Sequence, residues 1–171
     1  MGAVWAWVEQ VPPLLGIILL TLLPALELRA SIPYGLLGTG LPLWQVVLAA
    51  VLANWAIAPL VYLFLRHVVR LLERWPWFAR LWERYTARVQ SRAQRAVESW
   101  GTWGLALFIG IPLPGSGVYT GALGAYLLGM SLRRFIWVAL AGVLIAAALV
   151  TLITATGSEA FSWMIRKWGS G

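Results

Sequence analysis

The sequence GLALFIGIPLPGSGVYTGALGAYLL, residues 104–128, decides how the chain folds. Its middle, Pro112 to Gly117, holds two prolines and two glycines inside an otherwise apolar segment. Proline lacks the N–H group that a helix needs, and glycine permits sharp backbone turns. The apolar parts on either side are short, because a helix needs about 20 residues to cross roughly 30 Å of hydrocarbon. The stretch therefore predicts two half-helices separated by a break.

The composition of the whole chain places these half-helices in a lipid bilayer. Of 171 residues, 61% are hydrophobic and 11% are charged, whereas soluble proteins average about 45–50% apolar and about 25% charged residues. Thirteen Lys and Arg against six acidic residues give a net charge of +7. In so hydrophobic a chain, this excess indicates orientation in a membrane and contact with anionic lipid rather than binding of nucleic acid.

Three more apolar blocks give the chain a repeated order of segments. Leu14 to Leu26 is short, and Leu43 to Leu65 is long enough to span; Phe135 to Ile153 is a second full span. The order is a short broken segment, a span, a linker, a short broken segment and a span. The sequences GLPL, residues 40–43, and GMSL, residues 129–132, precede the two spans as a faint echo. Many transporters build a site at the bilayer midplane from such repeats of broken helices.

We therefore expect an all-α integral membrane protein that forms a single membrane domain, residues 1–171. Two re-entrant hairpins, each followed by a transmembrane helix, would form an inverted repeat. The first hairpin with its helix would comprise residues 12–65, and a basic cytoplasmic linker would follow at residues 66–99. The second hairpin with its helix would comprise residues 100–156, and a C-terminal tail would end the chain at residues 157–171. The alternative is that both broken segments cross the membrane. Positive residues favour the cytoplasmic side of a membrane, and both arrangements place ten Lys and Arg residues there. The distribution of charge therefore does not distinguish the two arrangements.

The linker is predicted to be a basic amphipathic helix on the membrane surface. Five arginines recur at helical spacing: Arg80, Arg84, Arg88, Arg92 and Arg95. An apolar stripe follows one position over: Leu81, Tyr85, Val89, Ala93 and Val97. This pattern is typical of a helix that lies in the interface, where it would contact lipid headgroups. A solvated helix that only connects and orients the halves is the alternative.

Glu27 and Arg29 place ionisable groups at or near membrane depth, at the end of an apolar helix and before a turn at Pro33. Such a charge costs at least about 2.5–3.5 kcal/mol to insert, so intramembrane charges are normally buried, paired and functional. A carboxyl group in a low-dielectric cavity can bind and release a proton, which makes Glu27 the strongest candidate. The alternative is that both residues cap a short helix at the interface and reach water.

The second break offers backbone groups and hydroxyls. Glu27, Arg29 and Pro33 are the candidate binding residues of the first half of the chain. Those of the second break are Pro112, Pro114, Gly115, Ser116, Gly117, Tyr119 and Thr120. A helix that begins after the break has free N–H groups, which can hold a phosphate or a carboxylate. The alternative is that the prolines and glycines only make the turn of a hairpin. Because the breaks of inverted repeats meet near the midplane, we expect Glu27 and this break to form one site.

Other chemistry has little support in the sequence. With one His, no Asp and no Cys, the usual hydrolytic and metal sites cannot be built, so we expect no enzyme, no metal and no cofactor. Gly115 and Gly117 alone do not make a dinucleotide fingerprint. Asn54, inside the first span, is expected to be a packing contact between helices.

Two motifs carry a resemblance to a known family. They are ELRASIP, residues 27–33, and IPLPGSGVYTGA, residues 111–122. Both resemble the bacterial and archaeal small multidrug export proteins, a family that is in turn similar to the DedA superfamily. Members of that superfamily carry two opposed re-entrant hairpins, each followed by a transmembrane helix, and include transporters of undecaprenyl phosphate and lipid scramblases.

The resemblance implies a multi-pass transporter or flippase of a lipid-like or amphipathic substrate in the plasma membrane of a prokaryote. Glu27 would couple protons or substrate, and Arg29 would contact the headgroup, because Gly110 and Gly117 stand where DedA proteins usually have arginines. A small drug exporter is one alternative function. A non-transporting membrane protein, whose basic linker docks a partner or anionic lipid, is another. The expected partners are membrane lipids and the substrate, without nucleic acid, and a homo-oligomer is compatible with the sequence.

Overall fold

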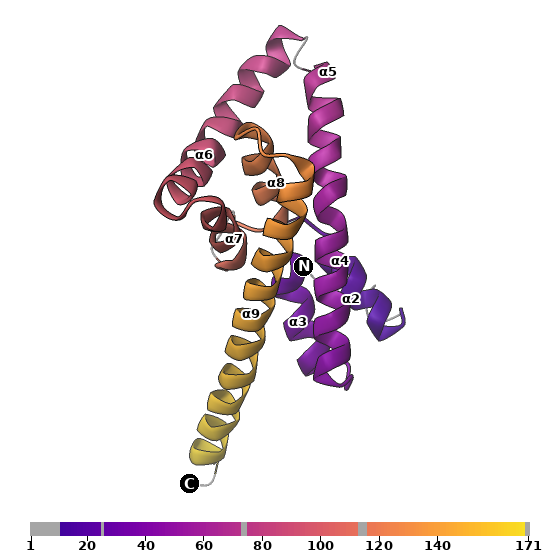
Figure 1. Cartoon of the computed structure of the whole chain (residues 1–171). Coiled ribbons are helices and arrows are strands. Elements are labelled where there is room, and N and C mark those ends of the chain that lie inside the picture. Colours follow the sequence, from indigo (N-terminus) through magenta and orange to yellow (C-terminus); the bar gives the residue numbers. More distant parts are fainter. Residues whose placement is uncertain (1–10, 25, 73–74, 113–115, 170–171) are drawn as a thin grey trace.

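The computed structural model describes residues 11–24, 26–72, 75–112 and 116–169, which form helices and no strands (Figure 1). The elements are α2 (Pro13–Thr21), α3 (Glu27–Gly38), α4 (Leu43–Phe64), the π-helical turn η1 (Leu65–Val69), α5 (Arg70–Leu72), α6 (Pro76–Trp100), α7 (Thr102–Gly110), α8 (Val118–Leu127) and α9 (Leu132–Gly169). The predicted all-α class is confirmed for these residues.

Among the described residues, two helices are long and apolar enough to cross a membrane, Leu43–Val69 and Leu132–Gly157. Both spans are predicted by the sequence, but the second helix is longer than expected. α9 continues to Gly169, so that the first part of the predicted C-terminal tail is helical. A single glycine such as Gly157 weakens a helix by only about 1 kcal/mol, and no proline follows it to end the helix.

α4 and α9 run in opposite directions (Figure 1). Near the C-terminal end of α4, the Tyr62 ring stacks on Phe135 with ring centroids 5.5 Å apart, and its hydroxyl donates a hydrogen bond to the carbonyl oxygen of Met130. Near the N-terminal end of α4, Val47 lines a groove together with Thr151. The start of α9 therefore lies beside the end of α4.

Replacing Tyr62 by phenylalanine tests this junction. The ring that stacks on Phe135 stays, but the Met130 carbonyl loses its donor, so we expect the free energy of unfolding to fall by about 1 kcal/mol. The measurement is a denaturant titration of the protein in mixed micelles. Tyr126→Phe is the control, because the Tyr126 hydroxyl makes no hydrogen bond with a described residue. An equal loss in both variants would contradict a specific role for the Tyr62 hydroxyl.

α2 and α3 pack side by side and meet the start of α4. Thr21 Oγ1 donates a hydrogen bond to Ser31 Oγ at 2.6 Å. Gly35 of α3 lies against both neighbours, since a Cβ atom there would be 2.4 Å from Val46 and 3.0 Å from Ile17. α2 thus begins at the end of the molecule where α3 ends and α4 begins.

α7 and α8 have the same relation to α9. Thr102, the first residue of α7, accepts a hydrogen bond from the guanidinium of Arg134 near the start of α9. Gly121 of α8 lies against Ile109 of α7, where a Cβ atom would be 2.4 Å from Ile109 Cγ1. α7 therefore begins, and α8 ends, at the opposite end of the α4 and α9 pair from α2.

The same backbone turn precedes both long helices. Gly40 has a φ of +67° and Gly129 a φ of +66°, and a long helix begins three residues after each. These values lie in the left-handed region, which glycine adopts without strain. The faint sequence echo between the halves therefore corresponds to a shared local structure.

The first break lies elsewhere than predicted. Pro33 is inside α3, and the described residues Leu22, Leu23, Pro24 and Leu26 form a turn before Glu27. A proline within a helix loses one backbone hydrogen bond, here to the Arg29 carbonyl, and neighbouring helices make such a loss tolerable. Glu27 and Arg29 consequently lie in the first turn of α3, not at the end of the preceding helix.

α6 packs against α7 and α8. Ala93 is buried, and Val89 and Val97 are partly buried against the core. These positions of the predicted apolar stripe therefore face protein instead of lipid, because α7 and α8 cover them. The side chains of the other two members, Leu81 and Tyr85, lie outside the described residues.

Candidate functional site

Glu27 begins α3 and is almost fully buried. Its side chain has an exposed fraction of 4%. Its backbone φ of +48° lies in the left-handed region, which a residue with a side chain rarely adopts. Such strain persists only where the surrounding structure holds the residue in place, and it is common at functional sites.

The Glu27 carboxylate accepts hydrogen bonds from the first two residues of α8. The Val118 N–H group donates to Oε2 at 3.3 Å, and the Tyr119 N–H group donates to Oε1 at 3.5 Å. The first N–H groups of a helix have no partner within that helix. A side chain from α3 thus caps a helix that begins 91 residues later.

Gly117 makes this approach possible. Its φ of +126° is a conformation that residues with side chains avoid. A Cβ atom on Gly117 would lie 2.5 Å from both carboxylate oxygens of Glu27. Glycine is therefore required at this position both for the backbone conformation and for the space that Glu27 occupies.

Arg29 binds the other side of the same break. Its Nη1 donates to the Ser116 carbonyl oxygen at 2.8 Å, and its Nη2 donates to the Ser116 hydroxyl at 2.8 Å. Nη2 also reaches the Ile111 carbonyl oxygen at 3.5 Å, to which the Ser116 hydroxyl donates at 2.6 Å. Ile111 directly follows α7, so the guanidinium lies against the C-terminal end of that helix.

The two charges complement the two helix ends. A helix carries a partial positive charge at its N-terminus and a partial negative charge at its C-terminus. Glu27 meets the N-terminus of α8, and Arg29 meets the C-terminus of α7. We call this arrangement the tip junction; its members are Glu27, Arg29, Ile111, Ser116, Gly117, Val118 and Tyr119. Its two opposite charges come from one turn of α3, so together they add no net charge.

Three further contacts surround the tip junction. The Asn54 side chain of α4, which is 1% exposed, hydrogen-bonds with the Glu27 carboxylate. The Tyr119 hydroxyl donates to the Leu22 carbonyl oxygen and so links the first break to α8. Thr120 Oγ1 donates to the Gly117 carbonyl oxygen at 3.3 Å. Both breaks are therefore fixed to one another by side chains from each half.

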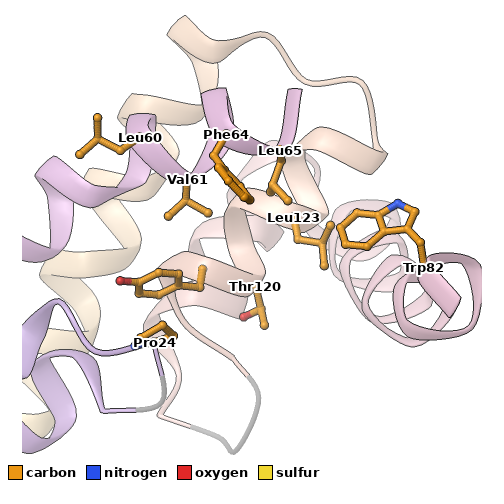
Figure 2. A pocket seen from close by; sticks show the side chains of 9 residues that line it. Pro24, Leu60, Val61, Phe64, Leu65, Trp82, Thr120 and Leu123 are labelled. Carbon is orange, nitrogen blue, oxygen red and sulfur yellow. The ribbon is translucent and has the colours of Figure 1, made fainter. Parts of the chain in front are cut away.

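A pocket of about 540 Å³ adjoins the tip junction. Its lining is mostly apolar and comes from the first break, α4, η1, α6 and α8: Pro24, Leu60, Val61, Phe64, Leu65, Trp82, Tyr119, Thr120 and Leu123. In Figure 2, Pro24 and Thr120 lie on the side of the pocket opposite Phe64, and Trp82 lies at its flank. Ligand pockets typically measure about 300–1,000 Å³, so this one can hold part of a small amphipathic molecule.

The structure brings many of the predicted site residues together. Five of them belong to the tip junction: Glu27, Arg29, Ser116, Gly117 and Tyr119. Thr120 adjoins them through Gly117, whereas Pro33 lies further along α3 and Pro112 lies in the connection after α7. Pro114 and Gly115 lie outside the described residues. The spatial meeting of the two motifs is thus observed, and their role in transport remains a prediction.

The predicted anion site at the start of α8 is occupied by the chain itself. The N–H groups of Val118 and Tyr119 are not free, because both donate to Glu27. The prediction that these N–H groups are free was therefore wrong. The Glu27 carboxylate, which comes from the other half of the chain, occupies them. An external anion would have to displace Glu27 in order to bind there.

The predicted membrane-surface arginines lie on α6. Arg80, Arg92 and Arg95 are exposed, and Arg80 and Arg95 donate to backbone carbonyls of their own helix. None of these three contacts the tip junction. The side chains of Arg84 and Arg88 lie outside the described residues. Contact of this arginine face with anionic lipid remains a prediction.

Sequence reasoning missed the place of Asn54 at the site and the carbonyl groups of Leu22 and Ile111. A signal for Asn54 exists, since a polar side chain inside an apolar span is often functional. The backbone acceptors leave no such signal, because every residue type carries the same carbonyl group.

A family model described as "Putative small multi-drug export protein" matches residues 27–149. The match begins at Glu27 and includes both halves of the tip junction. No curated protein and no solved structure matches the chain. The relation to the DedA superfamily stays an expectation from the sequence. Because the matched residues make up more than half of the chain, the protein belongs to the small multi-drug export protein family.

Proposed function

We propose that this protein is a membrane transporter that moves an amphipathic, lipid-like substrate across the bilayer, with its binding site at the tip junction and the adjoining pocket. The name of its family indicates export of small molecules, and two of its helices are apolar enough to span a membrane. The observation that carries the proposal is the buried Glu27 carboxylate, held on the N-terminus of a helix from the other half.

The four short helices support an arrangement of re-entrant hairpins. α2, α3, α7 and α8 have 9, 12, 9 and 10 residues. At 1.5 Å per residue, each is about 14–18 Å long, roughly half the 30 Å of a hydrocarbon core. Each pair begins and ends at one end of the α4 and α9 pair, and the breaks meet between them. We infer two opposed hairpins related as an inverted repeat.

The exposed bases support one orientation of these hairpins. Arg66 follows α4, and Arg133 and Arg134 stand at the start of α9; all three are exposed. The contact of Tyr62 with Met130 places them at the same end of the molecule. Because positive charge favours the cytoplasmic side, that end faces the cytoplasm. The start of α4 and the far end of α9 then face outside.

The chemistry around the tip junction favours a substrate with an apolar part and an anionic group. The apolar lining of the pocket suits a hydrocarbon chain or ring. The N-terminus of α8 and the Arg29 guanidinium suit a phosphate or carboxylate. Tyr119 belongs to both the pocket and the tip junction, so one molecule can reach both.

Proton uptake by Glu27 provides a step that can open the tip junction. A charge-assisted hydrogen bond is roughly twice as strong as a neutral one. Protonation therefore weakens the bonds from Val118 and Tyr119, whose N–H groups become available to the anionic group of the substrate. The two hairpins can then separate, and loss of the proton allows Glu27 to return.

Glu27→Gln tests this role. The amide keeps the shape of the side chain, but it has no charge and cannot exchange a proton. Losing a charge-assisted hydrogen bond costs about 1.5–3 kcal/mol, so we expect transport to fall at least about tenfold. The measurement is the movement of headgroup-labelled fluorescent phosphatidylglycerol across the bilayer of proteoliposomes, by quenching from outside.

Glu98→Gln is the matched control, because Glu98 is exposed on α6 and hydrogen-bonds with Gln94. We expect it to transport like the wild type. A Glu27→Gln variant as active as Glu98→Gln would contradict the proposed mechanism. Wild-type vesicles that move a lipophilic cationic dye but no lipid would favour the small drug exporter, and vesicles that move neither would favour the non-transporting alternative.

A further inference from the structure

Asn54 is the one asparagine of the chain, and it is buried in α4 beside Glu27. Burying a polar amide costs free energy unless its donors and acceptor are paired. The side chain of Asn54 hydrogen-bonds with the Glu27 carboxylate. Its Oδ1 atom, however, is buried without a hydrogen-bond partner. An unused acceptor therefore lies next to the most buried acidic group that the structure describes.

The present partners of the Glu27 carboxylate are donors. They are the N–H groups of Val118 and Tyr119 and the amide of Asn54. An ionised carboxylate only accepts hydrogen bonds, so this set suits the charged form. When Glu27 takes up a proton, one of its oxygens becomes a donor and needs an acceptor.

The charged and titratable neighbours on α3 and α8 do not supply this acceptor. Arg29 has donors only, and it uses both Nη atoms on the second break. The Tyr119 hydroxyl is engaged with the carbonyl oxygen of Leu22. Tyr126, in the last turn of α8, is a full helix length away from Glu27 at the first turn. Tyr34, the other titratable group of α3, lies roughly two turns beyond Glu27. None of these side chains is a described hydrogen-bond partner of the Glu27 carboxylate.

The described side chains of the other packed helices add no titratable group near Glu27. α2 and α7 carry none. On α4, the Tyr62 hydroxyl is engaged with Met130. On α9, Arg133 and Arg134 lie at the start of the helix, where Arg134 binds Thr102. The side chains of Glu159, Arg166 and Lys167, further along α9, lie outside the described residues. Asn54 is thus the described side chain in contact with Glu27 that carries an unused acceptor.

We propose that Asn54 is the positioning residue for the proton on Glu27. Rotation of its amide by 180° lets it donate to the charged carboxylate and accept from the neutral carboxyl group, so that Glu27 keeps a partner on α4 in both forms. The inference rests on the proposed function in one respect, namely that Glu27 exchanges a proton. The new element is that protonation moves the strongest hydrogen bond of Glu27 from the N–H groups of α8 to Asn54 of α4.

Isotope labelling tests the proposal in the unmutated protein. Asparagine with ¹⁵N in its side chain labels Asn54 alone. In bilayers of phosphatidylcholine and phosphatidylglycerol, infrared difference spectra between neutral and acidic pH should show a Glu27 carboxyl band and a label-sensitive amide band of Asn54. Glu27→Gln should remove both. A Glu27 band with no change at Asn54, or no Glu27 band in the wild type, would overturn the proposal.

Asn54→Leu gives a second measurement. Leucine has a similar volume and no polar group, so the Glu27 carboxyl band should shift to the higher frequency of a carboxyl group without a hydrogen bond. Gln45→Leu makes the same chemical change on the same helix and should leave that band in place. An unshifted band in Asn54→Leu would overturn the proposal.

Lipid transport measured on the same vesicles separates this proposal from the proposed function. A label-sensitive Asn54 response without any transport would contradict the transporter and leave the role of Asn54 intact. Transport that depends on Glu27, with Asn54 unresponsive, would overturn the role of Asn54 and leave the transporter intact.

Discussion

Gly117→Ala is expected to lower transport at least as far as Glu27→Gln does. The new Cβ atom would lie 2.5 Å from both oxygens of the Glu27 carboxylate, so the carboxylate must leave the N-terminus of α8. A φ of +126° adds backbone strain of about 1–3 kcal/mol for alanine. We therefore expect at least about a tenfold loss of transport and a fall of at least about 2 kcal/mol in the free energy of unfolding.

Gly129→Ala is the matched control for this substitution. Gly129 also has a positive φ, but a Cβ atom there meets nothing within 4 Å. It should lose some stability and keep transport. The double variant with Glu27→Gln should transport no worse than Gly117→Ala alone, because residues that act as a unit are not additive. Equal transport in Gly117→Ala and Gly129→Ala would contradict the tip junction as a functional unit.

Gly142→Ala is expected to destabilise the protein by forcing α7 away from α9. A Cβ atom on Gly142 would lie 2.8 Å from the Ala106 carbonyl oxygen and 2.7 Å from Ile109 Cβ. The opposing Gly110 is equally close to α9, with a Cβ position 2.7 Å from Ile145 Cγ2. Overpacking of this kind typically costs about 1–3 kcal/mol. Denaturant titration in mixed micelles measures this loss.

Gly157→Ala makes the same change in the same helix, but we expect it to raise the free energy of unfolding instead of lowering it. Gly157 is exposed, and a Cβ atom there meets nothing within 4 Å. Alanine favours a helix over glycine by roughly 0.5–1 kcal/mol, so this variant should be slightly more stable. If Gly142→Ala proved as stable as Gly157→Ala, the close packing of α7 on α9 would be wrong.

The sequence predicts the helices of this fold better than their breaks. Apolar length alone identifies α4 and the first part of α9, and the sequence of Pro112 to Gly117 predicts the second break. Pro33 misleads, because the cost of a proline inside a helix depends on the neighbours that surround it. The true first break has Pro24 as its main local signal. Local residue types therefore indicate where a helix can break, and packing decides where it does.

The candidate site shows the same division. A glutamate beside an apolar segment and a second broken helix are visible in the sequence, and the repeated order of segments predicts that they meet. The direct bond between them is not visible, since it joins Glu27 to backbone N–H groups 91 and 92 residues away. Nor does the sequence show that Arg29 occupies carbonyl groups of the same break. These pairings depend on the tertiary contact between the two halves.

Glu27 is synthesised well before α8, the helix that it caps, and this delay matters for how the chain enters the membrane. Tyr119 leaves the ribosome 92 residues after Glu27, which at 5–20 residues per second is a delay of roughly 5–20 s. Throughout that interval Glu27 and Arg29 lack the partners that the second break and the start of α8 supply. A nascent chain that stops before α8 therefore keeps Glu27 and Arg29 without these partners, and we expect its first half to insert less stably than the same half of the full chain.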